Sequence, residues 1–201
     1  MSAAETLDPD AQTGTYPRPP VTSGRVVWIT GLSGAGKSTV ARELLRLLRK
    51  DGQWCISLDG DELREVFGQA APRSEDYERP ARLALGRRYA RLAHLVAQQG
   101  ATAVVTTISL FRELHDWNRK NLPGYFEVYL KVPIEELQRR DPKGIYRRFD
   151  SGELRNVAGL DQPADEPQSP DLLVEFSPDE APAEIAARVM QRLAQTGPGC
   201  R

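Results

Sequence analysis

Residues 31–38 of this chain read Gly31-Leu32-Ser33-Gly34-Ala35-Gly36-Lys37-Ser38. This stretch matches the G-x-x-x-x-G-K-[S/T] phosphate loop at every defined position. The apolar run 25–30 precedes it and the helical pattern 39–50 follows it. Strand, loop and helix are the context that the motif requires. The sequence therefore predicts a nucleotide-binding loop, and not a glycine-rich turn that happens to precede a helix.

The residue types of this phosphate loop suit the binding of phosphate groups. Glycines let successive backbone N–H groups point at one phosphate, and the N-terminus of the following helix adds partial positive charge. Lys37 supplies a full charge to the β- and γ-phosphates, and the Ser38 hydroxyl can ligate Mg²⁺. We expect the nucleotide to be held by the loop residues Gly31, Ser33, Gly34, Ala35, Gly36, Lys37, Ser38 and Thr39.

Composition and charge argue against several classes of protein. The net charge of −1 gives no global attraction to nucleic acid or to an anionic membrane, and no apolar run approaches the ~20 residues that span a bilayer. Residues 1–23 are acidic and then proline-rich, without the regions of a signal peptide. We expect a disordered leader there, one domain over 24–196 and a tail over 197–201. Two cysteines, Cys55 and Cys200, are too few for a disulfide framework and favour a reducing cytoplasm.

Strand and helix patterns alternate along the domain. The sequence predicts strands at 26–30, 54–58, 103–107, 126–132 and 172–176. It predicts helices at 39–50, 61–67, 80–99, 111–121, 133–140 and 182–195. This alternation predicts an α/β fold, a three-layer sandwich with a five-stranded, mostly parallel sheet and helices on both faces. Ligands of such sheets lie beyond the carboxyl ends of the strands, so 31–38, 59–64 and 107–112 should surround one crevice.

Two carboxylates, Asp59 and Asp61, follow the second predicted strand. One of them could accept a proton from an acceptor hydroxyl, and the other could hold Mg²⁺ together with Ser38. Arg64 lies one helical turn further on and could bind an anionic acceptor. The alternative is a capped helix start, with either carboxylate as the N-cap. Beside a phosphate loop we favour the functional interpretation.

A basic cluster lies in residues 139–148, where five of ten side chains are Arg or Lys. It could close over phosphates as a lid and exclude water. The alternative is a solvated basic helix end. The following stretch, 141–171, has little periodicity, and a structureless stretch of this length in a compact domain is usually functional or disordered. We therefore expect a lid over about 141–170.

Together these residues resemble the adenylylsulfate kinases, which use MgATP to phosphorylate the ribose 3′-hydroxyl of adenosine 5′-phosphosulfate in sulfate assimilation. The resemblance covers about residues 24–176, and its most specific string is Asp141-Pro142-Lys143-Gly144-Ile145-Tyr146. It implies a P-loop kinase fold with a lid, ATP and Mg²⁺ as donor and metal, and a small nucleotide as the partner.

The resemblance also implies roles for individual residues. Asp61 would be the base or orienter of the acceptor hydroxyl, with Lys37 and the lid residue Lys143 beside the transferred group. Arg64 and Arg82 would hold the anionic group of the acceptor. The remaining candidate site residues are Ser38 and Asp59 for the metal and Arg139 and Arg147 of the basic cluster for the nucleotides. For the acceptor they are Asp59, Tyr77, Leu85, Ile108, Ser109, Lys143 and Val157.

The sequence departs from this family mainly in the part expected to bind the acceptor base. Leu85 stands where the family usually has Asn, Val157 replaces an aromatic residue, and Ala164 replaces Tyr. The loss of a hydrogen-bonding group alters which base is tolerated. Adenylylsulfate is the first acceptor we expect. Cytidine diphosphoramidate, the substrate of similar kinases in surface-polysaccharide modification, is a close second, and Trp117-Asn118-Arg119 looks like that branch.

A different class of function is a nucleotide-binding regulatory protein that hydrolyses ATP slowly. The pair Asp59 and Asp61 and the predicted lid argue against it, and rapid acceptor-dependent release of ADP would separate the two. The sequence leaves the oligomeric state open, with a homodimer as one option.

Overall fold

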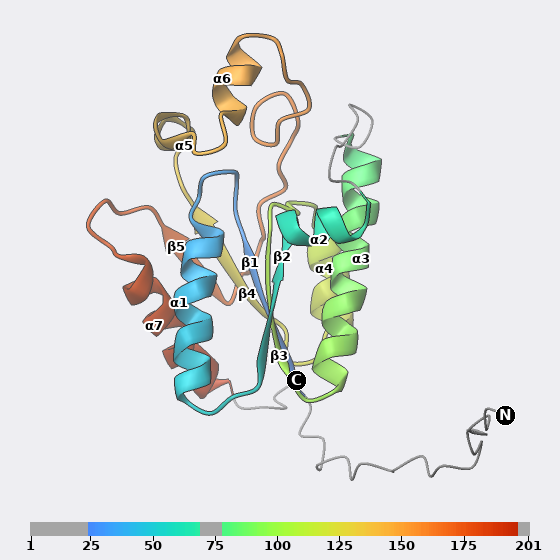
Figure 1. Cartoon of the computed structure of the whole chain (residues 1–201), viewed down its shortest axis with the longest axis vertical. Helices are drawn as coiled ribbons and strands as arrows, with labels where there is room; N and C mark the ends of the chain where they lie inside the picture. The colour runs from blue at the N-terminus through green and yellow to red at the C-terminus, as the bar shows by residue number, and fades with distance from the viewer. Residues whose placement is uncertain (1–23, 69–77, 197–201) are drawn as a thin grey trace, which may run out of the picture.

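The computed structural model describes residues 24–68 and 78–196 (Figure 1). The expected leader, the expected tail and Tyr77 lie outside the described residues. Five strands form one sheet in the order β2-β3-β1-β4-β5, and every neighbouring pair is parallel. The strands are β1 Arg25–Thr30, β2 Cys55–Asp59, β3 Thr102–Thr107, β4 Phe126–Lys131 and β5 Leu172–Glu175. The predicted α/β sandwich is confirmed, with a sheet that is parallel throughout.

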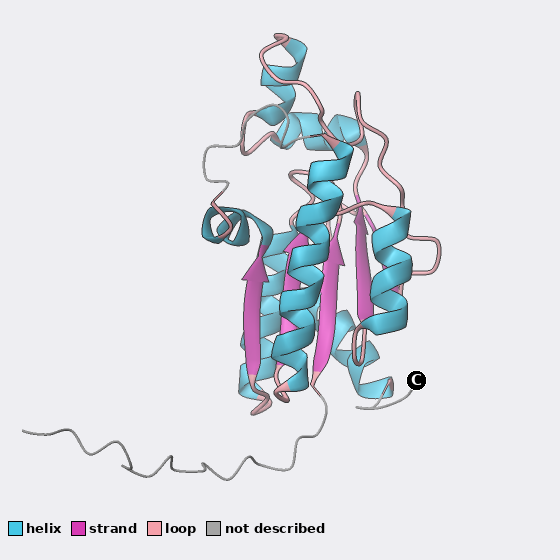
Figure 2. Ribbon diagram, turned by 90° about the vertical axis from the view of Figure 1, so that its right-hand side faces the viewer, coloured by secondary structure: helices cyan, strands magenta, loops and turns pink. Residues whose placement is uncertain are grey.

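Helices cover both faces of the sheet (Figures 1 and 2). On one face lie α1 and α7, on the other α2, α3 and α4, while α5 and α6 stand beyond the carboxyl ends of the strands. Their bounds are α1 Lys37–Lys50, α2 Gly60–Val66, α3 Arg79–Gln98, α4 Arg112–Asn121, α5 Ile134–Arg140, α6 Ile145–Asp150 and α7 Pro182–Gln195. None of the helices within the described ranges is long and apolar enough to span a bilayer.

The central strand β1 is buried on both of its faces. Val27 and Ile29 pack into the core beneath α1 and α7, whereas Val26 and Trp28 pack into the core beneath α3 and α4. Successive side chains of a strand point to opposite faces, so one uninterrupted apolar run supplies both cores. This is the pattern expected for a parallel strand between two helical layers.

The strand register brings the ends of three strands to one edge of the sheet. Thr30 of β1 lies opposite Thr107 of β3, and Asp59 of β2 lies opposite Thr106. The loops that follow these strands therefore begin side by side. This edge is where the sequence places the candidate site.

The expectation of little regular structure over 141–171 is wrong for its first part, because Ile145–Asp150 form α6. The Asp141 carboxylate caps this helix by accepting the backbone N–H groups of Tyr146 and Arg147, both at 3.2 Å. Tyr146 is buried, with 1% of its surface exposed. Six residues make fewer than two helical turns, which is too short for an amphipathic pattern to be recognised.

Burial of Leu44 should contribute strongly to stability. This α1 residue is 0% exposed and packs in the core with β1 and α7. We expect Leu44→Ala to lower the free energy of unfolding by about 2–5 kcal/mol, because it removes buried methyl groups and leaves a cavity. Leu95→Ala on α3, where the leucine is 57% exposed, is the control and should change it by less than ~1 kcal/mol. Denaturant titration measures both, and equal losses would contradict the assigned core.

Candidate active site

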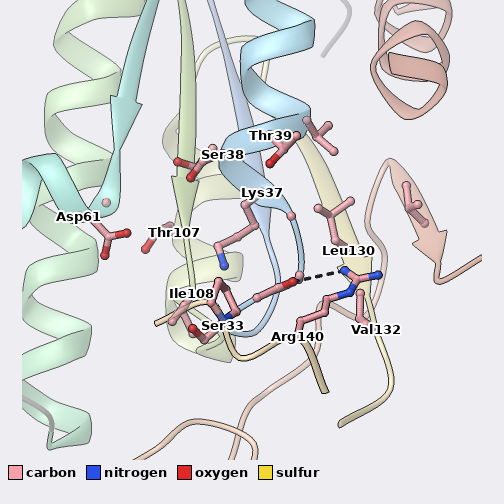
Figure 3. Close-up of a pocket in the computed structure, with 18 of the residues that line it drawn as sticks. Ser33, Lys37, Ser38, Thr39, Asp61, Thr107, Ile108, Leu130, Val132 and Arg140 are labelled. Carbon is pink, nitrogen blue, oxygen red and sulfur yellow. Dashed lines mark hydrogen bonds between the residues drawn. The ribbon is translucent and has the colours of Figure 1, made fainter. Parts of the chain in front are cut away.

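A cavity of about 910 Å³ opens at the carboxyl edge of the sheet (Figure 3). Its volume is in the range of small-molecule sites. Most of the residues that the sequence singles out line it, and they come from the phosphate loop, α2, α3, the segment after β3 and the lid. These are Ser33, Gly34, Ala35, Gly36, Lys37, Ser38, Thr39, Asp59, Asp61, Arg64, Arg82, Leu85, Ile108, Ser109, Arg139 and Lys143.

Hydrogen bonds from neighbouring side chains hold the phosphate loop in shape. Gly36 has φ of 92°, a left-handed conformation that glycine adopts without strain. Three side chains donate to the carbonyls of the loop. Lys37 Nζ donates to Leu32 O at 2.8 Å, Tyr146 Oη to Ser33 O at 3.0 Å and Arg140 Nη1 to Gly34 O at 3.3 Å. Arg140 ends α5 and Tyr146 belongs to α6, so both sides of the start of the predicted lid are joined to the phosphate loop.

Lys37 lies in the middle of the cavity, with Asp61 on one side and Arg140 on the other (Figure 3). The pKa of the Lys37 amine is lowered to about 8, first by burial and then by the positive charge of Lys143. The carboxylates of Asp61 and Asp59 act in the opposite direction. A buried cation with a depressed pKa is poised to gain a negatively charged partner.

Asp59 joins three segments at the floor of the cavity. Its Oδ2 accepts hydrogen bonds from Ser38 Oγ at 2.7 Å and from Thr106 Oγ1 at 2.6 Å, and its Oδ1 accepts from the backbone N–H of Asp61 at 2.9 Å. Partial burial raises the pKa of this carboxyl, but the three hydrogen bonds outweigh it and keep the pKa below its ordinary value. Asp59 is therefore both the N-cap of α2 and a partner of the phosphate loop, so the two interpretations of this residue are compatible.

Ser38 and Asp59 offer the oxygen ligands that Mg²⁺ prefers, in direct contact with each other. Among the described residues no group of three or more His, Cys, Asp and Glu gathers into a metal site. Mg²⁺ in phosphoryl-transfer sites is usually held by one or two carboxylates together with substrate phosphates. The donor set thus fits a metal ion that arrives with a nucleotide.

Asp61 presents its carboxylate to the cavity from the first turn of α2. Its side chain is 69% exposed, and Lys143 of the lid forms an ion pair with it. Thr107 lies near it at the end of β3 (Figure 3). An accessible carboxylate beside Lys37 is well placed to meet a hydroxyl group of a second substrate.

The other predicted residues differ in how they meet the cavity. Leu85 of α3 lines it although only 3% of its surface is exposed. Arg82 also donates to Asn156 O and Gln162 Oε1, both at 3.4 Å. These bonds tie α3 to the return segment, the stretch 151–171 that leads from α6 to β5. Three predicted residues of the described part stand outside the cavity wall: Gly31 at the start of the phosphate loop, the buried Val157, and the exposed Arg147, which pairs with Asp141.

Sequence reasoning missed a cation–π pair at the far side of the cavity. The Arg140 guanidinium lies 4.8 Å from the centroid of the Phe176 ring, and both residues line the cavity. Arg140 was visible within the basic cluster and Phe176 at the end of the last predicted strand, but no spacing signal pairs residues so far apart. Sequence reasoning also missed Thr106, whose hydroxyl donates to Asp59. It lies in a strand rich in β-branched residues, where nothing distinguishes it from a residue of the core.

Comparison with known proteins agrees with this geometry. Residues 23–175 match the family model of adenylylsulphate kinase. A cytidine diphosphoramidate kinase from Campylobacter jejuni is 37% identical over 169 residues, covering 84% of this chain and 96% of that protein. An adenylyl-sulfate kinase from Clostridium acetobutylicum is 42% identical over 154 residues, covering 76% of this chain and 74% of that protein.

A solved structure gives the same result. The APS kinase of Mycobacterium tuberculosis in complex with AMPPNP and APS superimposes with a TM-score of 0.78 and 34% identity, covering 86% of this chain and 98% of that one. With a family model matched over most of its length, the chain belongs to the adenylylsulphate kinase family and is a phosphotransferase that acts on a hydroxyl group.

Proposed function

We propose that the protein transfers the γ-phosphoryl group of ATP to the ribose 3′-hydroxyl of a small nucleotide. The observation that supports this most is the meeting of Lys37, Asp61 and Lys143 in one cavity, which the phosphate loop lines together with residues of α2 and α3. Such a site has the parts that phosphoryl transfer needs: donor binding, a group for the acceptor proton and a cation for developing charge.

ATP would occupy the half of the cavity that the phosphate loop lines. The loop amides and Lys37 would bind the β- and γ-phosphates. The Arg140–Phe176 pair offers a flat, polarizable surface against which a purine can stack. Mg²⁺, held by Ser38 and Asp59, would neutralise charge on the phosphates.

Asp61 would orient the acceptor hydroxyl and take its proton. As the bond between the γ-phosphorus and the β,γ-bridging oxygen breaks, the acceptor oxygen forms the new bond to phosphorus, and ADP leaves. Lys143 is already paired with Asp61, so the lid brings a positive charge to the place where negative charge moves. Positioning and electrostatics supply most of the rate in such reactions.

Two acceptors are candidates, and each has its own support. Adenylylsulfate follows from membership of the family. Cytidine diphosphoramidate is supported by a specific observation at the acceptor half of the cavity, the part lined by Arg82, Leu85 and Phe111. The buried Leu85 offers no hydrogen bond to a base edge there. The similarity to a cytidine diphosphoramidate kinase over 96% of its length adds to this. We infer that the cytidylyl compound is accepted at least as well as adenylylsulfate.

A regulatory protein with slow ATP hydrolysis is the alternative of another class. It has no need of an accessible carboxylate in a second substrate space. Initial rates of ADP release with and without acceptor separate the two, because a kinase releases ADP rapidly only when its acceptor is present. Equal slow release in both cases would reject the kinase proposal.

Binding of MgATP should take up a proton just above pH 8. The pKa of Lys37 is about 8 in the free protein, and a triphosphate beside the amine raises it. Affinity should stay nearly flat below this pH and fall by up to about tenfold per pH unit above it. Calorimetry in two buffers of different ionisation enthalpy measures the uptake. In Lys37→Arg the charge is permanent, so proton uptake should vanish; unchanged uptake would show that another group titrates.

Replacement of Asp61 should affect turnover and spare donor binding. Asp61→Asn keeps the shape but removes the proton acceptor, so we expect kcat to fall by about 10²–10⁴-fold with little change in KM for ATP. Glu62→Gln, a neighbouring exposed carboxylate on the same helix, is the control and should be near normal. A collapse of ATP affinity with normal kcat would instead assign Asp61 to the metal.

Leu85 should set part of the choice between acceptors. We expect the wild type to use cytidine diphosphoramidate at least as well as adenylylsulfate, judged by kcat/KM. Leu85→Asn should shift the ratio toward adenylylsulfate by about 10- to 100-fold, since a regained edge contact is worth ~1–3 kcal/mol. Ala84→Asn on the exposed side of α3 is the control.

The ratio is measured within each variant, so a loss of folded protein cancels. A wild-type preference for adenylylsulfate of several thousand-fold, unmoved by Leu85→Asn, would show that this position does not select the base.

A further inference from the structure

Asp165, in the segment that leads to β5, forms hydrogen bonds with residues at and near the starts of α3 and α4. Its backbone N–H donates to Leu110 O at 3.0 Å. Its Oδ2 accepts from Arg79 Nη2 at 3.0 Å and from the backbone N–H of Arg112 at 3.2 Å. Its backbone carbonyl accepts from His115 Nε2 at 3.2 Å. Of these four hydrogen bonds, one reaches α3, two reach α4 and one reaches Leu110, just before α4.

These contacts surround Phe111. Leu110 and Arg112 are its neighbours in the chain, and the Arg79 guanidinium lies 5.0 Å from the centroid of its ring. Phe111 is buried and lines the cavity from the side of Arg82 and Leu85. The position of this ring therefore depends on the groups that Asp165 holds.

Asp165 also replaces a cap that α4 lacks. Phe111 stands at the N-cap of α4, and no side chain there accepts a hydrogen bond from the first turn. The first N–H groups of a helix need acceptors from elsewhere. The Asp165 carboxylate supplies one to Arg112, across 53 residues of sequence. The hydrogen bond from Arg112 and the nearby charge of Arg79 lower the pKa of this carboxyl against the effect of partial burial.

The buried Glu127 holds the imidazole of His115 on the side opposite Asp165. His115 Nδ1 lies 2.7 Å from Glu127 Oε1 of β4. Glu127 in turn accepts hydrogen bonds from Tyr125 Oη at 2.8 Å and from Arg119 Nη2 at 3.2 Å. Because Glu127 is only 3% exposed and belongs to the central sheet, the histidine that meets the Asp165 carbonyl is fixed from behind.

We propose that Asp165 is a positioning residue for acceptor binding, which fixes the Phe111 ring as the wall of the acceptor half and links that wall to the return segment of the lid. The ligand that this wall serves is the base or sugar of a nucleotide, because a fixed aromatic ring offers a flat apolar surface with positive charge behind it. The inference rests on the proposed function for the identity of the acceptor half. It concerns acceptor affinity and leaves the donor half untouched.

Steady-state kinetics of Asp165→Ala test the proposal. We expect KM for the acceptor to rise by about tenfold, since hydrogen bonds to a charged group are lost, while kcat and KM for ATP change little. Asp165→Asn keeps one acceptor oxygen for Arg112 and should have an intermediate effect. Glu166→Ala is the matched control, because the next residue is exposed and its carboxylate pairs with Lys131 of β4. Its kinetics should match the wild type.

A double-mutant cycle with Arg79→Gln adds a readout that a general loss of stability would not move. If Asp165 acts through Arg79 and Phe111, the two changes should be non-additive in acceptor KM. Additive effects, equal losses in kcat and KM for ATP, or a normal acceptor KM in Asp165→Ala would each overturn the proposal.

Hydrogen exchange separates a failure of this inference from a failure of the proposed function. Amides 112–115 should exchange faster in Asp165→Ala than in Glu166→Ala, in the absence of any substrate. A wild type that phosphorylates neither acceptor would reject the proposed function, and the exchange data would still decide whether Asp165 holds this wall. Unchanged exchange at 112–115 would overturn the positioning role.

Discussion

The carboxylate of Asp59 is the contact on which the site depends most. It ties the first turn of α1 through Ser38, the end of β3 through Thr106 and the start of α2 through the Asp61 amide. Helix α1 comes after β1, and α2 comes after β2. Because β1, β2 and β3 are parallel and in register, their carboxyl ends lie at one edge of the sheet. Once the carboxylate is engaged, Asp61 has a fixed place relative to Lys37. The same oxygens are the natural ligands of a metal ion that enters with a nucleotide.

The predicted lid, residues 141–170, is attached to the core at both of its ends, and under the proposed function the two attachments lie at different halves of the cavity. At its base, Tyr146 and Arg140 donate to carbonyls of the phosphate loop. At its return, Arg82 and Asp165 connect it to α3 and α4. Between these points Lys143 meets Asp61. A segment anchored in this way can move only as far as its two ends allow.

The sequence contains strong signals for the scaffold and weak ones for the contacts that complete the site. The apolar run of β1 and the phosphate loop are local patterns, and both predictions were confirmed. Helix α6 was missed because six residues carry no usable period. The capping of α4 by Asp165 and the stacking of Arg140 on Phe176 join residues that are 53 and 36 positions apart. No local pattern reveals such pairs, because they exist only after the sheet has set the positions of the segments.

The proposed division of the cavity into a donor half and an acceptor half also explains why family membership leaves the acceptor open. The donor half is built from the phosphate loop and β2, where backbone geometry and a few charges dictate the residue types. The acceptor half is built from α3, Phe111 and the return of the lid, where shape and single hydrogen bonds decide. Leu85 can differ there without disturbing Lys37 or Asp59, because different elements carry them. Phosphoryl transfer demands little covalent chemistry of the protein. A change of acceptor therefore requires different side chains around the acceptor and no new mechanism.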